Sequence, residues 1–353
     1  MSLQFLQPYF GLGNGLQTKN VAGGAGGVGG WVELGRSTSA TPSVTGLSNK
    51  RYYMILGYGD TGSTSIARLR MNNDSGTNYS YRESSQGTAD GTGVSQAQLW
   101  AYQAGNPSGS DTTSFSVNYI SNFSTKEKLG IGWYSGISAS GAGTAPRRIE
   151  GVGKWANTTD SINRFDWQIQ DGSFNATSEM VVLGWDPADT HTNNFWTELA
   201  SGAGSGTSFD VTFTAKKYLW LQFYGNLSSG TGGLALRTGS GSVDTGTNYS
   251  RRIAKNFGGD GTQLSDDNIN PAYPDNPNNF FLNMFIVNVS GKEKLFISHL
   301  VDQSTAGAGT APNVYENVSK YTTTSGQIDR FRFLTAGGGT WSSTTKATIW
   351  GAD

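Results

Sequence analysis

One seven-residue stretch occurs twice in this chain. Asp74–Ser80 has the sequence DSGTNYS, and Asp244–Ser250 has the sequence DTGTNYS. In each copy the glycine tolerates turn conformations that other residues resist, and the Asp and Asn side chains can bond to the backbone of a turn. We therefore expect two equivalent turns, each followed by a tyrosine packed on a sheet, rather than two ligand-binding loops.

Further matches surround the two copies in the same order, and corresponding positions lie 165 to 170 residues apart. The matched segments are WVEL at 31–34 and WTEL at 196–199, KEKL at 126–129 and 292–295, GAGTAP at 141–146 and 307–312, and INRF at 162–165 and IDRF at 328–331. A unit of about 160 residues is large enough to form its own core. The sequence thus predicts two copies of one domain, at 31–188 and 189–353.

Short apolar segments with a period of two predict β-strands throughout both copies. Examples are FSVNY at 115–119, LGIGW at 129–133 and FDWQI at 165–169. Such alternation is typical of antiparallel strands with one buried and one solvated face. Only Ser95–Trp100 tolerates a helix, and it fits a strand equally well. We predict an all-β fold of two tandem antiparallel β-sandwich domains.

Residues 1–30 form a predicted N-terminal arm that ends in a glycine-rich tract at 23–30. Its composition is that of a flexible tether. The GxGxxG spacing within it lacks a preceding strand and a following helix, so no nucleotide cofactor is expected. The arm also carries large apolar residues, and we expect it to attach the protein to another surface. The alternative is that it folds back as an edge strand of the first domain.

Composition excludes several classes of function. The chain has 25 basic and 26 acidic residues, and only 14% of its residues are charged, against roughly 25% in average proteins. No net field would attract nucleic acid or anionic lipid. There are no cysteines, so disulfides and thiolate metal sites are excluded.

No apolar run approaches the roughly 20 residues of a membrane span. The first residues do not read as a signal peptide, so we expect synthesis in the cytosol.

The sequence offers little material for catalysis. His191 and His299 are the two histidines, and neither has the spacing of a metal ligand. Glu127 and Glu293 recur in the KEK segments, where we expect them to be solvated. We predict no catalytic, cofactor-binding or metal-binding residue, and no enzymatic activity. The segment Asp260–Asn279, rich in Asp, Asn and Pro, is interpreted as a long loop. Whether it binds calcium or a partner stays open, since the spacing of a known calcium loop is absent.

The tryptophans could serve either in the core or in sugar binding. Most occupy strand positions and are expected in the core, whereas Trp185 and Trp341 at strand ends fit either role.

The order of motifs in each repeat resembles a recurrent domain of tailed-bacteriophage virion proteins. Each repeat runs from the DxGTNYS turn through KEKL, GAGTAP and IxRF to a closing hydrophobic residue and glycine, over roughly 31–353. The resemblance implies a concanavalin- or jelly-roll-like sandwich and a structural or receptor-facing role in a tail, fibre or head decoration. It implies synthesis in the host cytoplasm and a location in the virion, with other virion proteins and copies of itself as partners, and host surface glycans as a further candidate. The alternative is a secreted, lectin-like carbohydrate-binding module.

Overall fold

The computed structural model describes residues 30–61, 67–102, 112–169, 173–187, 189, 193–230, 232–271, 279–303 and 305–353. Apart from Gly30, the predicted N-terminal arm lies outside the described residues, as does His191. Every regular element assigned in the described ranges is a β-strand. The prediction of an all-β fold is confirmed.

The first sandwich contains β1–β12. The strands are β1 (Val32–Thr38), β2 (Ser43–Thr45), β3 (Tyr52–Asp60), β4 (Ala67–Met71), β5 (Tyr79–Ser85), β6 (Gly91–Gln96), β7 (Leu99–Tyr102), β8 (Thr113–Ser121), β9 (Lys128–Ile137), β10 (Arg147–Trp155), β11 (Arg164–Ile169) and β12 (Glu179–Trp185). They form an eight-stranded sheet in the order β1-β12-β3-β8-β9-β10-β5-β6 and a four-stranded sheet in the order β2-β11-β4-β7. All pairings are antiparallel.

The second sandwich repeats this arrangement with β13–β24. The strands are β13 (Thr197–Ala203), β14 (Ser208–Thr212), β15 (Tyr218–Ser229), β16 (Gly233–Gly239), β17 (Tyr249–Lys255), β18 (Gly261–Asp266), β19 (Asn279–Val287), β20 (Lys294–Asp302), β21 (Asn313–Tyr321), β22 (Arg330–Ala336), β23 (Thr340–Trp341) and β24 (Lys346–Ala352). The large sheet follows β13-β24-β15-β19-β20-β21-β17-β18, with β23 added beside β15, and the small sheet follows β14-β22-β16. The strand orders of the two large sheets correspond one to one, as the sequence repeat requires.

The two DxGTNYS stretches are equivalent turns, as predicted. The Asp74 carboxylate accepts hydrogen bonds from Gly76 N and Asn78 Nδ2, and Asp244 accepts the same two bonds from Gly246 and Asn248. The tyrosine after each turn is buried, at 1% and 0% exposure. The turns therefore act through the backbone and the core, where they fix the start of β5 and β17.

Asp244→Ala is expected to lower the free energy of unfolding by about 1–3 kcal/mol, since several donors lose their acceptor. Burial alone would raise the pKa of Asp244, but bonds from Gly246, Asn248, Tyr321 and Thr323 outweigh it and hold the pKa below its ordinary value of 3.8. The stabilisation is thus present above that pH and is lost as the pH falls through the lowered pKa. Urea unfolding at pH 7 and pH 3 measures this effect, with exposed Thr245→Ala in the same turn as the control. An equal loss for the two variants at pH 7 would refute it.

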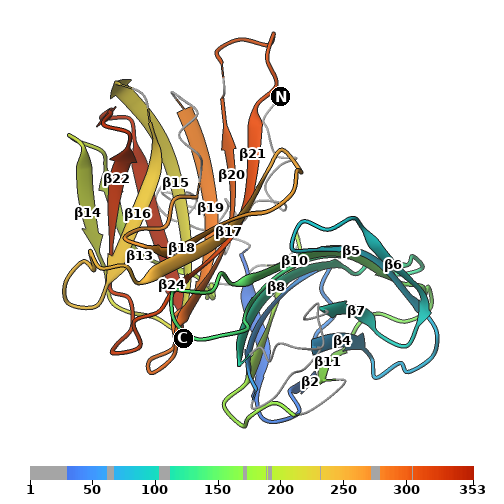
Figure 1. Cartoon of the computed structure of the whole chain (residues 1–353). Helices are drawn as coiled ribbons and strands as arrows, with labels where there is room; N and C mark the ends of the chain where they lie inside the picture. The colour runs from blue at the N-terminus through green and yellow to red at the C-terminus, as the bar shows by residue number, and fades with distance from the viewer. Residues whose placement is uncertain are drawn as a thin grey trace, which may run out of the picture.

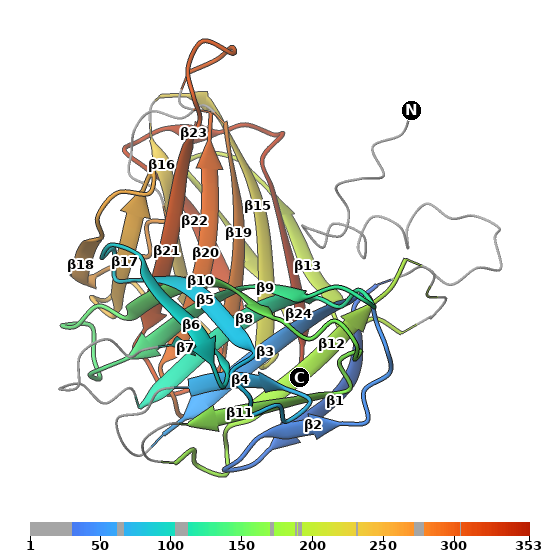
Figure 2. The same ribbon diagram turned by 90° about the vertical axis from the view of Figure 1, so that its right-hand side faces the viewer.

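The two large sheets face each other, with the small sheets on the outside. In Figure 1 the large sheet of the first sandwich arches over β2, β4, β7 and β11, and its other side meets the second sandwich. Figure 2 shows the strands of the two sandwiches crossing rather than running parallel. Each sandwich has its own core between its large and small sheets, and a third apolar cluster fills the junction.

This third cluster corrects the expectation that each strand has one solvated face. In β3, every residue from Tyr53 to Asp60 is buried, and β12 is buried along Glu179–Gly184. Alternate side chains of β3 enter different clusters: Tyr53 and Ile55 enter the core of the first sandwich, whereas Met54 and Leu56 enter the junction. The outer face of the sheet is dry because the other sandwich covers it.

The interpretation of Asp260–Asn279 as one long loop is partly wrong. Residues Gly261–Asp266 form β18, which pairs with β17 in a hairpin. Residues 272–278 lie outside the described residues. The polar composition of the segment concealed a strand because β18 is an edge strand that mostly faces solvent. The helix-tolerant Ser95–Trp100 contains the end of β6 and the start of β7, with a bend at residues 97–98 between them.

Candidate binding surface

The junction between the sandwiches is rich in aromatic side chains. Trp220 stacks on Phe285 with ring centroids 5.6 Å apart and lies 5.0 Å from Trp350. Trp133 of β9 meets His299 of β20 at 4.7 Å. The cluster draws on the large sheets of both sandwiches, including Met54, Leu56, Phe115, Val117, Ile137, Val181 and Leu183 from the first and Val287, Leu295, Ile297 and Val318 from the second. Packing of this extent makes the pair one block rather than two mobile domains.

Beside the apolar cluster, the GAGTAP loop of the first sandwich docks on the second sandwich through its backbone. We name residues 139–146 the first GAGTAP loop. Its carbonyl oxygens accept hydrogen bonds from the side chains of the second sandwich and from one of its backbone amides, and its Gly141 N donates to Glu293. The donors and their acceptors are Lys320 Nζ to Ala139 O at 2.7 Å, Ser265 N to Ala142 O at 2.9 Å, Ser250 Oγ to Thr144 O at 3.1 Å and Arg252 Nε to Pro146 O at 3.0 Å.

Arg148, two residues beyond this loop, is the centre of a buried charge cluster across the junction. Its guanidinium lies 2.6 Å from Asp260, 2.9 Å from Glu150 and 3.2 Å from Glu316. Burial and the neighbouring Glu150 raise the pKa of Glu316 to about 7, although Arg148 opposes the rise. Arg148 thus compensates three carboxylates at once, and Arg252, 3.9 Å from Asp260, adds a weaker contribution to one of them.

The apolar residues that the second sandwich buries in the junction have exposed counterparts in the first. Leu295, Ile297 and Val318 are 0%, 2% and 2% exposed, whereas their counterparts Leu129, Ile131 and Val152 are 57%, 38% and 49% exposed. The strand registers agree, because Ile131 pairs with Val152 as Ile297 pairs with Val318. We call the exposed residues Leu129, Ile131 and Val152, with the polar side chains around them, the open face. An apolar patch of this kind commonly marks an interaction site.

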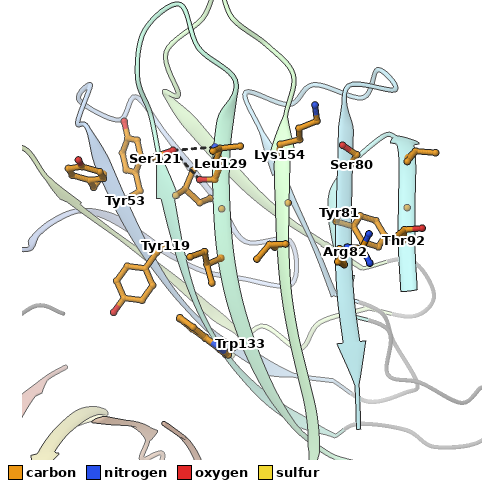
Figure 3. Close-up of a pocket in the computed structure, with 18 of the residues that line it drawn as sticks. Tyr53, Ser80, Tyr81, Arg82, Thr92, Tyr119, Ser121, Leu129, Trp133 and Lys154 are labelled. Atoms are coloured by element: carbon orange, nitrogen blue, oxygen red, sulfur yellow. Dashed lines mark hydrogen bonds between the residues drawn. The ribbon is translucent and has the colours of Figure 1, made fainter. Parts of the chain in front are cut away.

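The open face forms the floor of a groove of about 650 Å³. Figure 3 shows Tyr119, Leu129, Trp133 and Lys154 projecting from the neighbouring strands β8, β9 and β10, with Ser80 to Arg82 on β5 and Thr92 on β6 at the far side. The lining also includes Trp31, Tyr52 and Val94, and Val94 is 70% exposed. The groove thus combines an aliphatic floor, aromatic rings at one end and hydroxyl or cationic groups at its margins.

The structure corrects one expectation about the candidate acidic residues. Glu293 is not solvated: its side chain is 10% exposed, accepts a hydrogen bond from the Gly141 amide at 2.6 Å and lies 3.5 Å from Lys320. The first GAGTAP loop covers it. Glu127, at the matching position, is 40% exposed and pairs with Lys154, as expected.

His299 is packed in the junction against Trp133. Burial, with a smaller contribution from Arg148, lowers the pKa of His299 to about 4, so its imidazole is neutral at neutral pH. Within the described residues, no three His, Cys, Asp or Glu side chains are arranged to hold a metal ion. Among the same residues, no helix is long and apolar enough to cross a membrane.

The two tryptophans at strand ends have different roles. Trp341 is 2% exposed and packs against Phe223 in the core of the second sandwich. Trp185 stacks on Tyr52 at 5.4 Å beside the junction. Neither lines the groove. Tyr119 and Trp133, which do line it, sit mid-strand and carry no sequence signal of exposure.

Comparisons with known proteins add little. No family model and no curated protein matches the chain. Among solved structures, domains LG4-5 of the mouse laminin alpha1 chain match with 10% identity over 93% of this chain and 90% of that chain, at a TM-score of 0.18. The transport unit of the autotransporter AIDA-I from Escherichia coli matches with 9% identity over 77% of this chain and 90% of that chain, at a TM-score of 0.12. Superpositions this poor support no inference, so the open face is interpreted from its own contacts.

Proposed function

We propose that the chain is a non-enzymatic structural protein of a virus particle, exposed on its surface as a decoration, fibre or tail component. The open face is the observation that carries this proposal. Leu129, Ile131 and Val152 are exposed together on a rigid sheet, although the same three residue types are buried in the second sandwich. An apolar surface that is exposed in the single chain, although its counterpart is buried, is typical of a subunit that buries it against a partner on assembly.

The rigid junction supports the same proposal. Apolar packing and the buried Arg148 cluster hold the two sandwiches together, and such a block transmits load without a hinge. The low share of charged residues, 14%, suits close packing against other virion proteins. The resemblance of the repeats to tailed-bacteriophage virion domains is the reason for choosing a virus particle over other assemblies.

The test is the presence of the chain in purified particles. Particles from cultures that express the gene are banded on a density gradient, and an antibody against the chain is used for quantitative blotting and immunogold labelling. We expect a fixed number of copies per particle and label on the particle surface. A chain that stays in the soluble fraction, or that washes off completely at moderate salt, would count against the proposal.

A lectin-like carbohydrate-binding module is the second candidate, and the groove is the observation that favours it. Tyr119 and Trp133 offer rings for stacking on a sugar, and Ser80, Arg82 and Thr92 offer polar groups at the margin. Sugar titration followed by tryptophan fluorescence distinguishes the candidates, with Trp133→Phe as the control for the reporter. A saturable, sugar-specific shift would favour the lectin, and glycan binding by protein within particles would favour both roles together.

A further inference from the structure

The two sandwiches are joined by a loop and the face that receives it, and the chain carries a second loop and a second face of the same kind that are not in contact. The occupied set consists of the first GAGTAP loop and the face of the second sandwich that receives it. The unused set consists of the second GAGTAP loop, residues 305–312, and the open face of the first sandwich. Every described residue of this second loop is exposed.

The unused face repeats the chemistry of the occupied one residue by residue. The polar groups that bind the first loop are the side chains of Ser250, Arg252, Glu293 and Lys320 and the amide of Ser265. The first sandwich has the same residue types at the matching positions, which are Ser80, Arg82, Glu127, Lys154 and Ser95. Ser95 and Ser265 also share an unusual positive φ, 52° and 48°.

The two loops match as closely as the two faces. Both read GAGTAP, and their first glycines have positive φ values of 84° at Gly141 and 92° at Gly307. Both run through the same pattern of turns and bends before the next strand. The bonds made by the first loop come from backbone groups, so the same backbone in the second loop offers the same donors and acceptors.

We propose that the open face binds the second GAGTAP loop of another copy of this chain, so that chains assemble head to tail. A contact between two different surfaces generates a ring if the rotation between neighbouring copies closes, and an open filament if it does not. The open face does not extend to β3 and β12 of the same sheet, because Met54 and Leu183 on those strands are already covered by the second sandwich. The inference rests on the proposed function in that it names the partner of the open face.

The contact between copies is weaker than the contact within the chain. Within the chain, Asp60 binds Lys292 at 3.0 Å, and Arg148 binds Asp260 at 2.6 Å and Glu316 at 3.2 Å. In the second sandwich, Asn226 stands at the position of Asp60 and Val314 at the position of Arg148. The contact between copies therefore lacks all three of these ion pairs. Reversible association follows, and it becomes strong only when many copies are held together, as in a particle.

Cysteine cross-linking tests the geometry directly, because the chain has no native cysteine. One full-length chain carries Ser95→Cys and another carries Ala308→Cys, which are the counterparts of Ser265 and Ala142. The two proteins are mixed, each at a concentration on the order of 0.1 mM, and then oxidised. This is below the effective concentration of a tethered contact, which is in the mM range. We expect a product of two chains at least tenfold above that from a control pair of Leu264→Cys and Ala308→Cys. Ala142→Cys with Ser265→Cys in one chain is the positive control.

Sedimentation of the unmodified chain gives the second readout. Its average mass should rise with concentration, and Leu129→Glu on the exposed floor should abolish the rise, whereas Leu264→Glu, at another exposed leucine, should not. A chain that stays monomeric and cross-links no faster than the control pair would overturn the inference. Both assays use purified protein, so that result would leave the proposed role in a particle untouched.

Discussion

Leu295→Ala is expected to lower the free energy of unfolding of the full chain by about 2–5 kcal/mol, as for other leucines truncated in a packed interior. Leu295 is fully buried in the junction, at 0% exposure, so its removal leaves a cavity between two sheets that cannot readily collapse. Leu129→Ala is the matched control, since it alters the same residue type at the same strand position, where exposure is 57%. That change should cost about 0.5 kcal/mol or less.

Urea unfolding of dilute full-length protein measures both variants. If the unfolding shows two transitions, we expect Leu295→Ala to increase the difference between their urea midpoints, because the junction couples the two sandwiches. Equal losses for the two leucines would mean that the sandwiches do not pack as described.

Arg148→Met is expected to cost about 3–5 kcal/mol at pH 8, the usual effect of removing one partner from a buried ion pair. Asp260, Glu150 and Glu316 would then lose the cation that they share, and the side chain of Asp260 is 2% exposed. Arg252 and Arg147 are the nearby cations that remain. The control is Arg82→Met, because Arg82 pairs with Asp90, the counterpart of Asp260, while 60% exposed. An exposed pair of this kind contributes at most about 1 kcal/mol.

The cost of Arg148→Met should also depend on pH. The pKa of Glu316 in the folded chain is raised to about 7 from an ordinary 4.5, so the folded state holds a proton that the unfolded state has released. Stability through this group therefore falls as the pH rises from 4.5 to 7. Without Arg148 the carboxylates repel one another more strongly, so the loss should be larger at pH 8 than at pH 5. A loss that is the same at both values would show that Glu316 is not part of the cluster.

Much of the fold was predictable because its signals are local. The DxGTNYS turns bind their own backbone through Asp74 and Asp244, and the alternation in 129–133 and 165–169 reflects the pleat of a single strand. Local signals are weaker where a strand lies at a sheet edge: β18 is polar because much of it faces solvent, so its composition resembles that of a loop. The matched motifs predicted that two similar units exist, because duplication leaves its record in the order of residues.

The candidate binding surface was not predictable, and the matched pairs explain why. Leu129 and Leu295, Ile131 and Ile297, and Glu127 and Glu293 are identical in residue type, and the first and third pairs also share the surrounding KEKL segment. Even so, one member of each pair is exposed and the other is covered. No pattern within a repeat can distinguish them, since the difference lies in which sheet meets which loop across the junction. The strands, the turns and the duplication depend on neighbours along the chain, so they can be inferred from the order of residues. Which copy of the shared face is covered and which is left open depends on contacts between the two sandwiches, because their packing buries Leu295, Ile297 and Val318 and leaves Leu129, Ile131 and Val152 exposed.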